Sequence, residues 1–338
     1  MSEISFLGAG SWGTALAILL AKNGHKVTLW SKVEEEVKLL SENREHIHRL
    51  PGVKLPSSIT VTGDLKQAVQ GGKDLIVFSV ASPYVRATAQ EVSALISPGK
   101  RIVNVAKGIE EDTLMTLCDI IREEIPQADV AVLSGPSHAE EVSMGVPTTV
   151  VVGAGNKEFA LFLQETFMND RFRVYTSPDV LGIELGGSIK NVIALAAGVC
   201  DGLGCGDNTK AALITRGITE ITRLGKAMGA KEETFAGLSG IGDLIVTCTS
   251  THSRNHNAGY LIGQGYTMQA AMDEVKQVVE GVYSAKAAKK LAEKYQVSMP
   301  IVEGVNKVLF EGLSAETVMG LLLTRDRCNE YPDQGWNE

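Results

Sequence analysis

The sequence predicts an α/β N-terminal domain followed by an all-α C-terminal domain. In the first half, short β-branched runs alternate with helical stretches. The runs are almost continuously apolar, which is typical of a parallel sheet covered on both faces. After about Asp179 the strand-like runs disappear, and long segments with helical spacing replace them. The two halves are therefore expected to have different architectures.

Length and composition agree with two globular domains. The chain has 338 residues, and a typical domain has roughly 150. Hydrophobic residues make up 44% of the chain and charged residues 21%, as in folded rather than disordered proteins. We predict a first domain over residues 1–180, a second domain over 181–328, and a flexible tail over 329–338.

Charge and cysteine content exclude several classes of protein. The 32 Lys and Arg against 40 Asp and Glu leave a net charge of −8, which argues against nucleic acid as the main partner. The five cysteines include no Cys-x-x-Cys pair, so neither a disulfide framework nor a metal site is expected. No signal peptide is visible, and the longest apolar runs are far shorter than the about 18 residues of a membrane span. We expect a cytoplasmic protein without membrane insertion.

The elements follow from these patterns in chain order. Eight runs are predicted to be strands: Ile4–Leu7, Val27–Trp30, Ile59–Thr62, Leu75–Val80, Ile102–Val105, Val130–Leu133, Thr149–Val152 and Phe172–Tyr175. Helices are predicted at Thr14–Asn23, Pro83–Ile96, Leu114–Glu124, Leu185–Cys200, Ala285–Tyr295 and Thr317–Leu323. The helix from Leu185 has hardly any polar face, which indicates burial in the centre of the second domain. A direct strand-to-helix junction is expected near residues 177–182.

A glycine fingerprint follows the first predicted strand and opens the first helix. Residues 8–13 read GAGSWG, which is the pattern and the context of a dinucleotide-binding turn. Gly8 allows the tight turn, Gly10 lets the backbone approach a pyrophosphate, and Gly13 lets helix and strand pack closely. The helix N-terminus presents free N–H groups to the anion. The first domain is therefore predicted to be a Rossmann-type dinucleotide-binding domain.

The end of the second strand bears on the choice of cofactor. A site that prefers NAD usually offers a carboxylate there to the ribose 2′-hydroxyl. This chain has Ser31 and Lys32 instead, and the first acid is Glu34. We expect NADP or NAD as the cofactor, with NADPH favoured and Lys32 as a candidate contact. The alternative is that Lys32 is an ordinary surface lysine.

Two further strand ends carry candidate ligand contacts, because open α/β sheets bind ligands at their carboxyl edge. Lys107 follows the strand that ends near Val105. The segment SGPSHAE (134–140) follows the next strand, and Ser137 with Glu140 is predicted to form a capping box. The exposed start of that helix could also hold a ligand. His138 is expected to be a flanking, exposed histidine rather than an acid or base.

The second half contains two isolated charges in apolar surroundings. Lys190 is the only charged side chain in residues 185–200, and Asp243 is the only one in residues 236–253. Such residues are almost never buried without a partner. A lysine in a partly dry site can shift its pKa and transfer protons, which favours a catalytic Lys190. The alternative is a structural salt bridge between the two, or with Glu184 or Glu220.

Arg254 follows a Ser/Thr-rich stretch and opens a later helix. The segment Ser253–Asn255 suits an arginine that binds a phosphate through two parallel hydrogen bonds. This feature predicts a phosphorylated small-molecule substrate.

Taken together, these segments resemble the bacterial NAD(P)-dependent glycerol-3-phosphate dehydrogenases. The resemblance runs to about Arg327 and includes GAGSWGTALA (8–17), AKG (106–108), SGPSHAEEV (134–142), LGGSIKNVIALAAG (185–198), GDLIVTCTSTHSRN (242–255) and VVEG (278–281). It implies cofactor contacts from Ser11, Trp12, Lys107, Ala139, Arg254, Val278 and Glu280. It implies substrate contacts from Lys107, Gly135, Ser137, Lys190, Asp243, Ser253, Arg254 and Asn255, with Lys190 as the proton acceptor in the oxidation direction. Some relatives carry His or Arg near the end of the second strand, where this chain has Ser31 and Lys32.

The expected function is therefore an oxidoreductase that reduces dihydroxyacetone phosphate to sn-glycerol 3-phosphate, reversibly, for phospholipid synthesis. Lys190 would donate a proton to the developing alkoxide, and Asp243 would orient or balance it. A dehydrogenase for a hydroxy acid or a nucleotide sugar is one alternative. A protein that senses NADP without turnover is another, and the isolated charges argue against it. A homodimer is compatible with the sequence.

Overall fold

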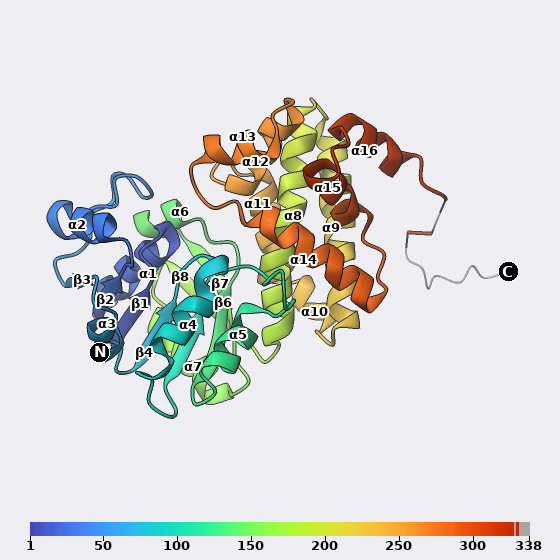
Figure 1. Cartoon of the computed structure of the whole chain (residues 1–338). Helices are drawn as coiled ribbons and strands as arrows, with labels where there is room; N and C mark the ends of the chain where they lie inside the picture. The colour runs from blue at the N-terminus through green and yellow to red at the C-terminus, as the bar shows by residue number, and fades with distance from the viewer. Residues whose placement is uncertain (328, 331–338) are drawn as a thin grey trace.

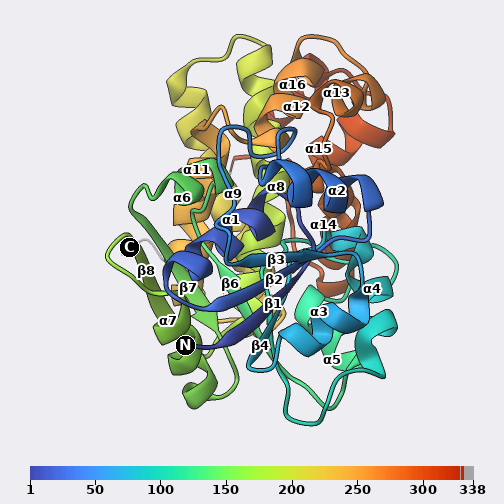
Figure 2. The same ribbon diagram turned by 90° about the vertical axis from the view of Figure 1, so that its left-hand side faces the viewer.

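A single eight-stranded sheet organises the first half of the chain (Figures 1 and 2). The computed structural model describes residues 1–327 and 329–330, so most of the expected flexible tail, 329–338, lies outside the described residues. The strands follow the order β3-β2-β1-β4-β5-β6-β7-β8. They are β1 Glu3–Leu7, β2 Lys26–Trp30, β3 Ile59–Thr62, β4 Leu75–Phe78, β5 Arg101–Asn104, β6 Asp129–Ser134, β7 Thr148–Gly153 and β8 Phe172–Ser177. All eight predicted strands are confirmed.

Helices cover both faces of this sheet, as the apolar strands predict. They are α1 Ser11–Lys22, α2 Glu34–Asn43, α3 Leu65–Gly71, η1 Ser82–Tyr84, α4 Val85–Ser93, α5 Leu117–Glu124, α6 Ala139–Met144 and α7 Lys157–Phe167. Successive strand residues point to opposite faces. In β4, Val77 therefore packs with Phe6 in one core, whereas Phe78 packs with Leu7 in the other.

The sheet departs from the all-parallel prediction at one edge. Strands β1 to β6 are parallel, but β7 pairs antiparallel to β6, with Val132 opposite Gly153, and β8 is parallel to β7. A parallel connection needs a crossover of a dozen or more residues, usually with a substantial helix. The connection after β6 holds only the short α6, which packs on α1. Strand β7 therefore starts at the end of the sheet where β6 finishes, and it runs antiparallel to β6.

The second half is helical around one central helix. Its elements are α8 Val180–Gly202, α9 Asp207–Ala227, α10 Glu232–Phe235, η2 Leu238–Gly242, α11 Asp243–Thr249, α12 Arg254–Gly263, α13 Met268–Val275, α14 Glu280–Tyr295, α15 Pro300–Phe310 and α16 Ala315–Leu323. Helix α8 contacts α9, α11, α12 and α14 and forms the middle of a separate core. Within the described residues it is the one helix long and apolar enough to cross a membrane, but 89% of that window is buried. Its apolarity is therefore that of a core helix, as predicted.

All six predicted helices are present, but their starts differ from the prediction; α8 begins at Val180 and not at Leu185, and α14 begins at Glu280 and not at Ala285. Helix α1 begins at Ser11, directly after the glycine turn, and not at Thr14. Helix α5 begins at Leu117 and not at Leu114, because Leu114 has a left-handed backbone with φ of 62°. At the expected junction, β8 ends at Ser177, and Asp179 caps α8 by accepting a hydrogen bond from the N–H of Gly182.

Candidate active site

The glycine turn has the geometry that a dinucleotide fingerprint requires. Gly8 has φ of +119°, and a Cβ there would lie 2.5 Å from the backbone nitrogen of Val80. A Cβ on Gly13 would lie 2.5 Å from the carbonyl oxygen of Gly8, so helix α1 packs closely on the turn. Gly10 precedes α1, whose first residues are Ser11 and Trp12.

This turn also has room and free donors for a ligand. Only the guanidinium of Arg49 comes within 4 Å of a Cβ built on Gly10, at 3.6 Å. The indole N–H of Trp12 is buried and has no hydrogen-bond partner among the described residues. The N-terminal N–H groups of α1 lie beside it, where the helix dipole favours an anion. The residues present therefore fit a dinucleotide.

The end of β2 differs from the sequence-based interpretation. Ser31 is buried, and its hydroxyl donates to Oε2 of Glu36 at 2.6 Å, so a carboxylate does stand at this strand end. Glu36 also accepts from Arg49, at 2.7 Å. Lys32 extends outward, with 68% of its side chain exposed, and pairs with Glu91 on α4. The cation that lies over the glycine turn is therefore Arg49, whereas Lys32 is engaged at the surface.

Lys190, Asp243 and Lys107 form one buried charge cluster. The Lys190 ammonium lies 2.7 Å from Oδ1 of Asp243, and the Lys107 ammonium lies 2.6 Å from Oδ2. Lys107 also donates to the carbonyl oxygen of Gly135 at 3.1 Å. The side chains of Lys190 and Asp243 are 6% and 2% exposed, whereas Lys107 is 18% exposed. Two cations share one carboxylate, so the cluster has a positive excess that suits an anionic substrate.

Burial controls the proton affinity of Lys190. Removal from water is the main reason that the pKa of its ammonium is lowered to about 8; the Asp243 carboxylate opposes this shift, and the charge of Lys107 favours it. The ammonium also donates to the hydroxyl of Thr247, which itself donates to the main-chain oxygen of Asp243. A lysine that is held at a fixed place and titrates near neutral pH can donate and accept a proton.

The segment after β6 departs from the predicted capping box. The residue that precedes α6 is His138, and no side chain caps this helix. Ser137 instead donates to the carbonyl oxygen of Gly135 at 2.8 Å, the oxygen that Lys107 also contacts. His138 is half-buried rather than exposed, and its ring lies 5.7 Å from that of His252. Ala139 is the first residue of α6 and is buried.

Ser253, Arg254 and Asn255 begin helix α12, as predicted. The Ser253 side chain accepts a hydrogen bond from the N–H of His256, and Asn255 bonds to the side chain of Asn191 at 3.0 Å. Arg254 is exposed, and its guanidinium donates a long hydrogen bond of 3.5 Å to the side chain of Gln277. The surrounding protein partly desolvates the guanidinium and lowers its pKa, but the group stays cationic. Arg254 is thus available to an anionic ligand.

Val278 and Glu280 lie at the start of α14. Val278 is half-buried, and Glu280 is the first residue of the helix. Glu280 accepts hydrogen bonds from the N–H and the hydroxyl of Ser82, the first residue of η1 after β4. Burial raises the pKa of the Glu280 carboxyl. The pair connects the helical part to the carboxyl edge of the sheet.

The structure decides between the partners that the sequence left open for Lys190. Asp243 is the partner, whereas Glu184 accepts from the N–H of Cys118, and Glu220 accepts from the N–H of Ile301. Thr247 was missed, although a position four residues after Asp243 on a helix was a usable signal. Arg49, Glu36 and Ser82 were also missed, and no local pattern marks them.

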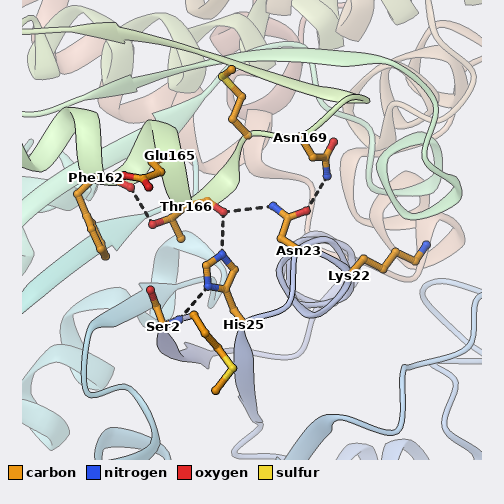
Figure 3. Close-up of a pocket in the computed structure, with 10 residues that line it drawn as sticks. Ser2, Lys22, Asn23, His25, Phe162, Glu165, Thr166 and Asn169 are labelled. Carbon is orange, nitrogen blue, oxygen red and sulfur yellow. Dashed lines mark hydrogen bonds between the residues drawn. The ribbon is translucent and has the colours of Figure 1, made fainter.

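One hollow of the structure lies away from this cluster. A cavity of about 500 Å³ lies beside the C-terminal end of α1 (Figure 3). Its polar groups bond to each other: His25 and Asn23 both bond to the carbonyl oxygen of Thr166, each at 3.2 Å. This cavity stands at the opposite end of α1 from the glycine turn. Within the described ranges, 1–327 and 329–330, no group of three or more His, Cys, Asp or Glu residues could hold a metal ion.

Comparison with known proteins gives consistent matches over nearly the whole chain. The family model for the N-terminus of NAD-dependent glycerol-3-phosphate dehydrogenase matches residues 3–160, and the model for its C-terminus matches residues 179–320. The chain is 60% identical to glycerol-3-phosphate dehydrogenase [NAD(P)+] of Agathobacter rectalis, over 99% of this chain and 100% of that protein. It is 56% identical to the corresponding protein of Fusobacterium nucleatum, over 99% and 100%. The crystal structure of glycerol-3-phosphate dehydrogenase from Coxiella burnetii matches with a TM-score of 0.92 and 38% identity, covering 95% of this chain and 98% of that one.

Proposed function

Because this chain belongs to the NAD-dependent glycerol-3-phosphate dehydrogenase family, we propose that Lys190, Asp243 and Lys107 form its catalytic centre. The chain is an NAD(P)-dependent oxidoreductase that reduces dihydroxyacetone phosphate to sn-glycerol 3-phosphate, reversibly. The observation that carries the proposal is the buried carboxylate of Asp243 between two lysine ammonium groups.

Lys190 is the general acid of the reduction. The bound nicotinamide cofactor supplies the hydride. Negative charge then develops on the substrate oxygen, and the Lys190 ammonium provides the proton that neutralises it. Asp243 and Thr247 hold this ammonium in place. In the oxidation direction the neutral amine of Lys190 takes the proton back.

Arg254 anchors the substrate phosphate away from the reacting carbon. Its exposed guanidinium can form two parallel hydrogen bonds with phosphate oxygens, and the first N–H groups of α12 lie beside it. Ser253 and Asn255 hold this helix start, since Asn255 bonds both to Asn191 and to the N–H of Gly281. Lys107, Gly135 and Ser137 supply further substrate contacts, and the first and last of them both donate to the carbonyl oxygen of Gly135.

The cofactor is held at the glycine turn by Gly8, Gly10, Ser11, Trp12 and Gly13. Lys107, Ala139, Arg254, Val278 and Glu280 complete its surroundings, as the family resemblance implies. We assign the contact with a 2′-phosphate to Arg49 rather than to Lys32. The support is the position of the Arg49 guanidinium, which lies over Gly10 while Glu36 beside Ser31 holds it.

The cellular role follows from the same proposal. A cytoplasmic enzyme of this kind supplies glycerol 3-phosphate to phospholipid synthesis and needs neither nucleic acid nor membrane insertion. The burial of the apolar α8 supports the absence of a membrane span. A homodimer is the assembly to test, by light scattering of the purified chain.

Single-turnover kinetics of Lys190→Met test the proposal. Hydride transfer from NADPH to dihydroxyacetone phosphate should slow by about 10²–10⁴-fold, since a positioned proton donor contributes this much. In the wild type, the reduction rate should fall as pH rises through about 8, where Lys190 loses its proton, and the oxidation rate should rise. NADPH affinity, measured by fluorescence, should stay unchanged.

Lys107→Met is the matched control, because it removes the other lysine on the same carboxylate. At saturating substrate the rate of reduction should still fall with rising pH, but with a higher midpoint, because the charge of Lys107 no longer lowers the pKa of Lys190. If a folded Lys190→Met protein transferred hydride at a rate within a few-fold of wild type, another group would have to donate the proton. No reduction of dihydroxyacetone phosphate with either NADPH or NADH would refute the function itself.

A further inference from the structure

The turn between α8 and α9 brings two cysteines together. Gly204 has φ of +77°, and its N–H bonds to the carbonyl oxygen of Asp201 at 3.0 Å. The N–H of Cys205 bonds to the carbonyl oxygen of Cys200 at 2.9 Å. These two bonds are the Schellman pattern of a helix end, in which the side chains of the first and last residues commonly touch. Here those side chains are both thiols.

The two thiols stand at the paired positions of this turn and are partly accessible. The sulfur of Cys205 lies 3.4 Å from the sulfur of Met319 on α16, and the proximity of Cys205 contributes to the raised pKa of the Cys200 thiol. Both cysteines are half-buried, whereas Cys118 and Cys248 are fully buried. The turn lies at the end of α8 that is far from the sheet (Figure 1). Ten residues of helix, about 15 Å, separate it from Lys190.

We propose that Cys200 and Cys205 are a modification site, a dithiol that a hydroperoxide converts into a reversible intramolecular disulfide. The backbone bond between the two residues already holds their main chains together at the helix end. Partly exposed thiols are the ones that oxidants reach, whereas buried thiols are inert.

The reaction proceeds in two balanced steps. The thiol of Cys205 attacks hydrogen peroxide, gives the sulfenic acid and releases one water. Burial and the neighbouring Cys205 raise the pKa of the Cys200 thiol to about 12, so Cys200 is the poorer first nucleophile and acts as the resolving thiol. Its sulfur then displaces the hydroxyl of the sulfenic acid, forming the S–S bond and a second water. The disulfide prevents further, irreversible oxidation of Cys205.

Peptide mapping of the whole enzyme tests this site. Trypsin cleaves after Lys190 and Lys210, so Cys200 and Cys205 share the peptide 191–210. Cys118, Cys248 and Cys328 fall on three other peptides, 108–122, 232–254 and 328–338. After mild peroxide treatment and alkylation, peptide 191–210 should be lighter by two hydrogen atoms and carry no alkyl group. Dithiothreitol should restore both thiols.

Cys200→Ser is the matched variant. Without a resolving thiol, Cys205 should gain oxygen atoms under the same treatment, and dithiothreitol should not reverse the sulfinic product. Cys248→Ser should behave like the wild type. Two results would overturn the proposal: oxygen addition to Cys205 in the wild type without disulfide formation, or oxidation of the buried Cys118 and Cys248 before peptide 191–210.

Discussion

At the scale of the residue, the position of a charge matters more than its presence in the sequence. Lys32 and Arg49 are both cations near the predicted cofactor site, but Lys32 pairs with Glu91 at the surface. Arg49 is turned toward Gly10 and held by Glu36. Burial would raise the pKa of Glu36, but the nearby His46, the hydrogen bond from Ser31 and the charge of Arg49 together lower it. Glu36 therefore stays ionised and keeps the guanidinium in place.

Replacement of Arg49 tests its role in cofactor choice. Arg49→Gln removes the charge that would face a 2′-phosphate, so the KM for NADPH should rise by about tenfold or more, as expected for a lost charge-assisted bond. The KM for NADH should change much less, because NADH carries no such phosphate. The measurement is kcat/KM for both cofactors at fixed dihydroxyacetone phosphate.

Lys32→Gln is the control for Arg49→Gln, since it removes a nearby cation that pairs with Glu91 at the surface. It should leave the ratio of the two kcat/KM values unchanged. If Lys32→Gln and not Arg49→Gln lowered the preference for NADPH, the assignment of the contact to Arg49 would be wrong.

At the scale of the element, glycines set the distance between α8 and α12. A Cβ on Gly198 would lie 2.0 Å from the carbonyl oxygen of His256, and one on Gly259 would lie 2.0 Å from that of Leu195. Backbone thus touches backbone where the two helices cross. This close crossing places the start of α12, with Arg254, relative to the Lys190 side chain on α8.

Gly198→Ala should therefore damage both stability and substrate binding. The added methyl group would clash with the backbone of α12, which cannot rotate away as a side chain can. Overpacking of this kind lowers the free energy of unfolding by about 1–3 kcal/mol or more. The midpoint of urea unfolding should fall, and the KM for dihydroxyacetone phosphate should rise as α12 shifts. Gly320→Ala on α16 is the matched control, because its Cβ meets nothing within 4 Å. Equal effects of the two substitutions would contradict the close-packing argument.

At the scale of the whole molecule, a buried carboxyl joins the two parts of the fold. Glu184 on α8 accepts from the N–H of Cys118 on α5 at 2.9 Å, and its side chain is almost fully buried. Burial raises the pKa of this carboxyl to about 7, against 4.5 for the unfolded chain. Between these values the folded state binds a proton that the unfolded state does not. The stability that Glu184 contributes is therefore present at low pH and lost as pH rises through about 7.

Glu184→Gln should stabilise the protein at pH 8 and do much less at pH 5.5. The amide still accepts a hydrogen bond from the N–H of Cys118, but it carries no charge. For a pKa shift of this size, the buried charge corresponds to on the order of 3 kcal/mol in the free energy of unfolding. Urea unfolding at the two pH values measures it. Glu316→Gln, at an exposed position on α16, should show little change at either pH. A Glu184→Gln effect that does not vary with pH would argue against titration of this carboxyl.

The sequence by itself determined the fold class, the glycine turn and two members of the proposed catalytic centre. Eight strands and the central helix α8 were predicted because apolar periodicity is a local property of the chain. Lys190 and Asp243 were found because each is a lone charge in an apolar segment, which requires a partner wherever it lies. The same local reasoning failed for Ser137: the expected capping box does not form, because α6 begins at Ala139 with His138 as the preceding residue, and the Ser137 hydroxyl donates to Gly135 instead.

Only the tertiary structure decided which distant residues meet. Lys107 joins Asp243 across 136 positions of sequence, and no periodicity encodes that contact. The reversal of β7 depends on where α6 packs, and Arg49 reaches Gly10 through a loop whose path the sequence pattern does not specify. Pairings of this kind arise from strand order, helix crossing and side-chain direction together. They become visible only when the whole chain is folded.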